Sequence, residues 1–442
     1  METVRLALKS LKYDTKKTKS YFLFQIFLSI AICLCCHFCA DFGTYIQNIP
    51  GYEYSVFIIN HVYFISQTFP PTTMFSIFLL FALVMLGFYA FQFIYQEQSK
   101  KIAVFRIGGV NTRKIVLFLF MYLLPITLTA MIVGTLLGFI FVQLLNYLIF
   151  SFSEAIYPGI QFSTDGIAIT IMILFIQMIY YIILTYGFVY RNEIKDVLNY
   201  NNNGNSLSNV RILQENKPFR IIFTLIGLTF IMYLLIKAGN ILSANIILGC
   251  TAIGIIMKTL IKDIIIPIIT KIKRTKYYQK TNGYFGYSFT ISNLVRSYGL
   301  IFVLSILYQF GVCLIVFFKD DAVDLSISVV LFLIATLAVV ISIGFQLLTA
   351  AKRKKKEYFE LFRIGKTNRD IKSIIKYDLS LFLIIVFLVS NIFPLITFGR
   401  SLFDGTITLG LMMVIIGIYS IELLVLYFIV KKNYYRIVKI DN

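Results

Sequence analysis

The sequence is poor in the residues that catalytic sites and soluble surfaces use most. Its 442 residues include no tryptophan and only two histidines, and 14% of them are charged. No lysine or arginine occurs from Ser20 to Ser99 or from Ile115 to Tyr190. No nucleophile, base and orienting group stand out together, so nothing argues for an active site. We therefore expect no catalytic residues, no cofactor and no enzymatic activity in this chain.

Apolar residues dominate instead. Hydrophobic residues make up 59% of the chain and its mean hydropathy is +0.83, which is more apolar surface than a soluble core of this size could bury. A membrane-spanning helix needs about 20 apolar residues. Runs that meet this requirement are found at residues 21–40, 72–95, 115–148, 167–190, 219–236, 241–260, 299–318, 325–350, 377–398 and 407–430. The sequence therefore predicts an all-α polytopic membrane protein with ten transmembrane helices.

The distribution of positive charge predicts an orientation. A net charge of +20 could indicate nucleic-acid binding. If the N-terminus is cytoplasmic, however, ten crossings leave only Lys237, Lys319 and Arg400 outside, as the positive-inside rule requires. We therefore expect both termini in the cytoplasm, a multi-pass protein of the cell membrane, and no nucleic-acid partner.

A cysteine-rich stretch, CLCCHFC, spans Cys33 to Cys39 at the outer end of the first run. Such crowding could bind a soft metal. Its spacing fits no tetrahedral zinc pattern, and small polarizable side chains suit helix packing. We expect no metal site there, and the role of the stretch stays open.

The letters GKT at residues 365–367 also end the ATP-binding P-loop motif. That motif needs a first glycine five places before the Gly-Lys pair, so that backbone N–H groups can surround the phosphates. Glu360 occupies this place, and its carboxylate would repel phosphate. The stretch therefore does not predict ATP binding by this chain.

The pattern F-R-I-G-x-x-N occurs twice, at residues 105–111 and 362–368, and we call these the first and second elbow. An ordinary inner loop explains their basic charge but not the five matched positions. Each elbow follows one long apolar run and precedes another. We expect Gly108 and Gly365 to take the left-handed conformation that ends a helix. The helix caps and dipole partners expected around them are Asn111 and Asn368 as N-caps, and Arg106 and Arg363 in the last turn of the preceding helix.

The two elbows belong to a larger repetition. We predict a first repeat of four spanning helices at 1–200, a second at 284–442, and a linker at 201–283 with two further spans and a basic interfacial helix. An even number of spans separates the repeats, so they are parallel, unlike the inverted repeats of many secondary transporters. Glu422 is the one acid that we place well inside the bilayer, where an ion-coupled carrier would need a chain of such groups.

These features resemble the FtsX-like permeases of ABC transporters over nearly the whole chain. The segments that carry the resemblance are KIAVFRIGGVNTRKI at 101–115, KKKEYFELFRIGKTNRDI at 354–371 and RNEIKDVL at 191–198. The order of helices and the stretch at 276–297 are similar to the bacitracin-resistance (BceB-like) permeases of bacteria. Those permeases carry a large extracellular domain, whereas this chain has only KDDAVDL at 319–325 in its place.

The resemblance implies a permease of the bacterial plasma membrane that pairs with a separate cytoplasmic ABC ATPase, expected as a dimer, which hydrolyses the ATP. The elbows would contact this ATPase. The resemblance assigns this coupling role to Arg106, Gly108, Asn111, Arg113, Arg363, Gly365 and Asn368. The expected function is export of, or immunity or resistance against, an antimicrobial peptide or a lipid-like amphiphile. Two alternatives remain: a mechanotransmitting regulator of a cell-wall enzyme or sensor histidine kinase, and an ion-coupled secondary transporter.

Overall fold

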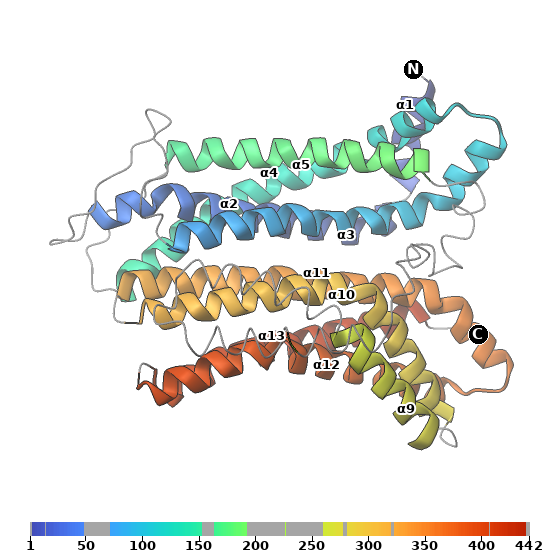
Figure 1. The fold of residues 1–442 in the computed structure, drawn as a ribbon. Helices are drawn as coiled ribbons and strands as arrows, with labels where there is room; N and C mark the ends of the chain where they lie inside the picture. Colours follow the sequence, from blue (N-terminus) through green and yellow to red (C-terminus); the bar gives the residue numbers. More distant parts are fainter. Residues whose placement is uncertain are drawn as a thin grey trace. The chain divides into compact units, whose positions relative to one another are not determined.

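The computed structural model describes residues 2–13, 15–47, 71–152, 163–191, 226, 260–276, 281–319, 322–405 and 407–438. These residues form mainly long helices (Figure 1). The chain divides into two compact units. Unit 1 comprises Met1–Val210 and Asp321–Leu331, and unit 2 comprises Arg211–Asp320 and Phe332–Asn442.

Unit 1 is built around one central helix. Its helices are α1 (Glu2–Tyr13), α2 (Thr15–Gln47), α3 (Pro71–Ile107), α4 (Thr112–Phe152) and α5 (Thr164–Arg191). The long helix α2 packs against α3, α4 and α5, while the short helix α1 packs on α4. Close approach of α2 and α4 depends on Gly134 and Gly138, because a Cβ atom there would lie 2.6 Å from the Cβ of Ser29 and 2.7 Å from that of Cys33.

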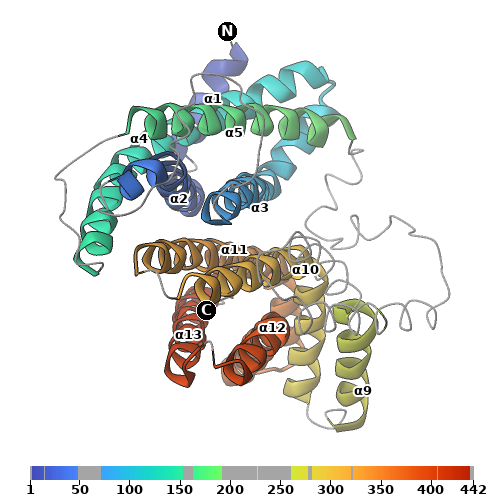
Figure 2. The same ribbon diagram turned by 60° about the vertical axis from the view of Figure 1, so that its left-hand side comes forward.

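Unit 2 contains a second set of four long helices and a short one beside them (Figure 2). Its elements are the π-helical turn η1 (Leu260–Ile265), α9 (Ile266–Lys276), α10 (Thr281–Phe317), α11 (Ala322–Arg363), α12 (Asn368–Phe403) and α13 (Leu409–Val438). The first ten residues of α11, 322–331, fall in unit 1. The central helix α10 packs on α12, and α9 packs on α10. Helix α11 contacts α13 where Gly344 faces Leu426.

The prediction of a multi-pass membrane protein is confirmed. Seven helices of the described chain are long and apolar enough to cross a bilayer, and α3 carries a shorter apolar stretch at Phe75–Tyr89. Helices α5 and α13 turn large apolar side chains outward, among them Phe175 and Ile183 on α5 and Val414 and Phe428 on α13. Such apolar faces suit contact with lipid tails.

Two of the ten predicted runs, 219–236 and 241–260, lie outside the described residues except for Ile226 and Leu260. The ten-helix count and the two-repeat architecture therefore stay predictions. In the cysteine-rich stretch, Cys33, Cys35 and Cys36 are buried in α2, in agreement with a packing role. The described residues hold no group of three or more metal-ligating side chains.

Candidate functional site

The first elbow is a tight turn that ends α3. The N–H of Gly109 donates to the carbonyl of Arg106 at 3.0 Å, and the N–H of Val110 donates to that of Phe105 at 3.0 Å. Gly109 has a φ of 70°. These two hydrogen bonds around a left-handed glycine form a Schellman motif, which satisfies carbonyl groups that the helix end would leave without partners.

The second elbow ends α11 with the same motif. Gly365 donates to the carbonyl of Phe362 at 3.0 Å, and Lys366 donates to that of Leu361 at 3.1 Å. Gly365 has a φ of 94°. The expectation for Gly365 is therefore confirmed, because an L side chain at this φ would be strained and glycine is not.

The expectation for Gly108 is wrong. Its N–H makes an ordinary helical hydrogen bond to the carbonyl of Val104 at 2.9 Å, and the left-handed residue is the next one, Gly109. The two turns thus correspond at a spacing of 256 residues, from Gly109 to Gly365, one fewer than the spacing of the sequence pattern. Two adjacent glycines made the first elbow ambiguous, and the backbone uses the second of them.

The caps of the following helices also differ. Asn111 caps α4 as expected, since its Oδ1 accepts from the N–H of Arg113 at 3.2 Å. In the second elbow the N-cap is Thr367, and Asn368 is the first residue of α12, so that expectation is wrong. Thr367 Oγ1 accepts from the N–H of Asp370 at 3.2 Å, while Asp370 Oδ2 accepts from the N–H of Thr367 at 3.0 Å. This reciprocal capping box makes Thr367 the better cap.

The arginines of the elbows have different surroundings. Arg106 lies in the last turn of α3 as expected, and its Nη2 donates to the carbonyl of Val189 near the end of α5. Arg363 lies in the last turn of α11, is exposed, and places its guanidinium 4.6 Å from the centroid of the Phe359 ring. Arg113, in the first turn of α4, is also exposed. The first elbow is therefore tied to α5.

The second elbow is tied to the start of α10 instead. Asn282 Nδ2 donates to Asp370 Oδ1 at 2.7 Å. Lys366 Nζ donates to Thr281 Oγ1 at 2.5 Å and to Asn282 Oδ1 at 3.1 Å. Both sides of the second elbow thus hold the N-terminus of α10.

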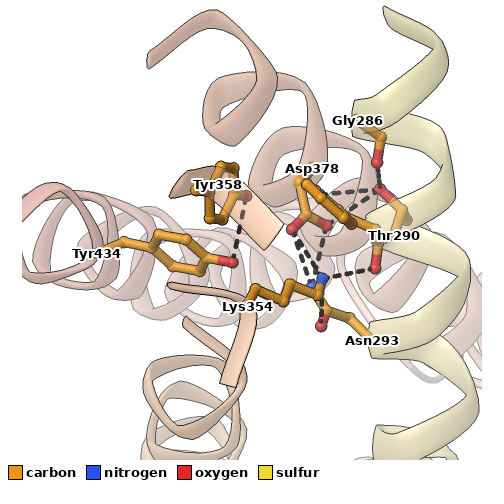
Figure 3. Close-up of polar contacts among 8 residues, drawn as sticks. Gly286, Thr290, Asn293, Lys354, Tyr358, Asp378 and Tyr434 are labelled. Carbon is orange, nitrogen blue, oxygen red and sulfur yellow. Dashed lines mark hydrogen bonds and ion pairs between the residues drawn. The ribbon is translucent and has the colours of Figure 1, made fainter. Parts of the chain in front are cut away.

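Deeper in unit 2, a buried ion pair joins the two helices of the second elbow (Figure 3). Lys354 of α11 places its Nζ 3.4 Å from Oδ2 of Asp378 in α12, and both side chains are almost fully buried, at 3% and 0% exposure. Helix α10 completes the cluster through Asn293, whose Nδ2 donates to Asp378 Oδ1 at 3.0 Å and whose Oδ1 accepts from Lys354 at 3.1 Å. The pair therefore fastens three helices at one point.

Further polar groups satisfy this pair. Lys354 Nζ donates to the carbonyl of Phe289 at 3.0 Å, and Thr290 Oγ1 lies 3.2 Å from Asp378 Oδ1. A buried ion pair repays the loss of hydration only when its geometry is good and extra hydrogen bonds serve both ions. Here α10 supplies those bonds, so the cluster favours one arrangement of α10, α11 and α12.

Sequence reasoning missed this cluster. Lys354 lies within the run KRKKK at 352–356, where each cation suggests an exposed surface. Asp378 is the second residue of the predicted apolar run 377–398. An acid inside a predicted span is a sign that could have identified it.

Unit 1 has no such pair at the corresponding place. Counted 256 residues back from Lys354 and Asp378, the corresponding residues are Gln98 and Tyr122, both buried and neutral. Another buried polar group among the described residues of unit 1 is also neutral: Tyr181 OH donates to Gln25 Oε1 at 2.9 Å and accepts from Gln177 Nε2 at 2.8 Å.

Glu422 lies on α13, midway along its span. Its Oε1 accepts from Thr336 of α11 at 3.1 Å. Among the described residues Glu422 has no ion-pair partner, whereas Asp378 has one. Asp378 is more deeply buried within the protein than Glu422. The expectation for Glu422 concerns depth in the bilayer and stays a prediction.

Comparison with known families gives one match. Residues 73–192 match the family described as FtsX-like permease C-terminal, a region that covers all but the first two residues of α3, the first elbow, α4 and α5. No curated protein matches the chain. The family match supports an ABC-transporter permease family for this chain, and members of such families generally partner with an ABC ATPase.

Proposed function

We propose that the chain is the transmembrane permease subunit of an ABC transporter and that its two elbows dock a separate ATPase. The observation that carries the proposal is the pair of Schellman turns, one inside the family match and one outside it, which have the same hydrogen-bond pattern. Each turn ends a helix that is longer than a bilayer requires: α3 has 37 residues and α11 has 42, against about 20 for one crossing. The elbows therefore extend beyond the apolar spans.

The exposed surface of the elbows supports docking. Ile107 is 65% exposed and Ile364 is 80% exposed, and the cations Arg113 and Arg363, which are near them in the sequence, are exposed as well. An apolar side chain surrounded by charge is typical of a protein contact surface. We assign the coupling role to the predicted residues Arg106, Asn111, Arg113, Arg363, Gly365 and Asn368, we replace the predicted Gly108 by Gly109, and we add Thr367 and Lys366. ATP would bind and be hydrolysed in the partner.

For the substrate, we propose an amphiphile such as an antimicrobial peptide, handled within the membrane. The outward faces of α5 and α13 are apolar, while Glu422 and the tyrosine and glutamine groups lie in the interior. Only four residues separate α10 from α11, which leaves little room at that place for a peptide-binding domain outside the membrane. The regulator and the secondary transporter remain the alternatives that the experiment distinguishes.

The test is co-purification of the tagged full chain from its native cells in nanodiscs, followed by ATPase measurement. We expect a stoichiometric ABC ATPase, with loss of coupled activity in Gly109→Val and Gly365→Val, because valine cannot hold the left-handed turn. Gly108→Ala is the matched control, since Gly108 has a helical hydrogen bond and room for a methyl group.

Recovery without any ATPase would overturn the proposal and favour an ion-coupled carrier. Recovery of the ATPase together with a cell-wall enzyme or sensor kinase, and without amphiphile-stimulated ATP hydrolysis, would favour the regulator. Normal coupled activity in both valine variants would show that the elbows are not the docking sites.

A further inference from the structure

A short amphipathic helix lies beside the elbow in each unit. In unit 1 this helix is α1, which packs on α4 and is joined to α3 by a hydrogen bond of 3.0 Å from Lys101 Nζ to Ser10 Oγ. Lys101 follows the end of the apolar run 72–95 and precedes the first elbow. Helix α1 therefore lies at the level where α3 leaves the apolar region.

One face of α1 is directed outward. Ala7 is fully buried, whereas the side chains of Arg5, Leu6, Lys9 and Tyr13 are exposed. Positions 5, 6, 9 and 13 share one side of a helix, because residues four apart are neighbours on its surface. This face therefore combines two cations with an exposed leucine (48%) and an exposed tyrosine (78%).

Helix α9 of unit 2 also combines cations with exposed apolar side chains on its outward face. Ile269 is buried, and Lys273 Nζ lies 4.1 Å from the centroid of the Tyr284 ring in α10. The outward side chains are Pro267, Ile268 (51% exposed), Lys271 and Arg274. Figures 1 and 2 show α9 beside the N-terminal part of α10, the part that carries the Asn282 contact to the second elbow.

Neither water nor hydrocarbon alone suits these faces. In water, the exposed leucine and isoleucine would stay solvated, and in hydrocarbon the cations would be desolvated at a large free-energy cost. The membrane interface suits both groups, because apolar side chains enter the acyl boundary while lysine and arginine reach the phosphates. By contrast, the faces that α5 and α13 direct outward consist mainly of large apolar residues.

We propose that the outward faces of α1 and α9 bind anionic phospholipid headgroups at the membrane surface on the elbow side. The cations that recognise the phosphates are Arg5 and Lys9 on α1 and Lys271 and Arg274 on α9. Each helix also touches its elbow region, through Lys101 in unit 1 and through α10 in unit 2. Headgroup binding therefore fixes the height of each elbow above the bilayer. The proposal does not depend on the ATPase.

The absence of tryptophan from the chain provides a direct test of depth. Leu6→Trp and Ile268→Trp each introduce a single fluorescent reporter on the proposed faces, and Ile364→Trp introduces one at the tip of the second elbow as a control. In nanodiscs that contain brominated lipids, we expect quenching of the first two reporters and not of the control. Equal quenching of all three, or no quenching at positions 6 and 268, would overturn the proposal.

Charge specificity is tested with Arg5→Gln/Lys9→Gln and Lys271→Gln/Arg274→Gln. Phosphatidylglycerol bound to the full chain is measured by native mass spectrometry, with phosphatidylcholine as the neutral comparison. We expect the affinity for phosphatidylglycerol to fall about fivefold for each cation removed. The matched control is Lys432→Gln/Arg436→Gln on α13, two exposed cations four residues apart that lie outside the proposed faces.

An equal loss in the α13 control would show a general charge effect and contradict the assignment. Displacement of the lipid by inorganic phosphate would indicate an anion site rather than a headgroup surface. Unchanged lipid binding together with loss of the co-purified ATPase would assign the faces to that protein. Failure of ATPase co-purification in the unsubstituted chain, by contrast, would leave the lipid result intact and affect only the permease proposal.

Discussion

The two units use one backbone turn and two different interiors. Both elbows are Schellman motifs with the same hydrogen bonds, at Gly109 and Gly365. In unit 2 the helices that meet at the elbow are joined by a buried lysine–aspartate pair, while the corresponding residues of unit 1 are a glutamine and a tyrosine. The same backbone turn is therefore compatible with either a charged or a neutral pair of buried residues between the helices that it joins.

The two elbows are also attached to different helices. The second elbow is held to α10 twice, at its tip through Asn282 and at its base through Asn293. The first elbow is held to α5, through Arg106 and Val189. We expect the two elbows to transmit movement to different helices, α10 in unit 2 and α5 in unit 1.

The largest expected effect comes from breaking the ion pair. Lys354→Met leaves the Asp378 carboxylate buried without its partner, and we expect a loss of about 3–5 kcal/mol in the free energy of unfolding. The double variant Lys354→Met/Asp378→Leu should recover much of this loss, because no unpaired charge remains. Unfolding in micelles or nanodiscs measures both. If Lys354→Met lost no more unfolding free energy than the deletion of a hydrogen bond in unit 1, the ion pair would not be important for stability.

The turns themselves test whether the two elbows are equivalent. Gly109→Val and Gly365→Val force a β-branched residue into the left-handed region, and we expect each to lose about 1–3 kcal/mol. Gly108→Ala should be close to neutral. If Gly108→Ala were as harmful as Gly109→Val, the left-handed residue would be Gly108 and the two turns would follow the sequence spacing instead.

The caps give a smaller effect that distinguishes the elbows. Thr367→Ala and Asn111→Ala each remove the side chain that caps the next helix, and we expect a loss of about 1 kcal/mol in each. Asn368→Ala should change the stability by less than about 0.5 kcal/mol, because Asn368 is the exposed first residue of α12 and not its cap. Chemical denaturation of the three variants side by side makes the measurement. A larger effect at Asn368 than at Thr367 would reverse the assignment.

The smallest effect is expected in the neutral interior of unit 1. Tyr181→Phe removes the hydroxyl between Gln25 and Gln177, and hydrogen bonds within membrane helix bundles average about 0.6 kcal/mol. Unfolding of this variant is compared with that of Lys354→Met. Similar losses in the two variants would remove the energetic difference between the units.

Much of the architecture could be predicted from the sequence because apolar runs and turn residues act locally. Eight of the ten runs lie on described helices, and both elbows occur where the repeated pattern places them. The exact turn residues were harder to predict. Gly108 and Gly109 are chemically identical, and Thr367 and Asn368 are both good caps, so the choice depended on the neighbouring Asp370.

Asp378 inside a predicted span is a sign that the sequence offers, but its partner could not be predicted, since the pairing depends on packing between helices. Lys354 resembles its exposed neighbours Lys355 and Lys356 in the sequence, and the contacts with Asn293 and Asp378 show that it is the buried cation. Asp378 and Glu422 are both single acids in apolar surroundings, but one meets a lysine and the other a threonine. Which residue pairs with a buried acid is determined by the packing of the helices.

The brevity of the elbows has a mechanical consequence. Four residues separate α3 from α4, and four separate α11 from α12, and the hydrogen bonds of each turn leave its backbone little freedom. A displacement of the turn would therefore move both adjoining helices together, because the turn itself deforms little. Lengthening either turn by a few glycines would make the connection flexible while leaving both helices intact.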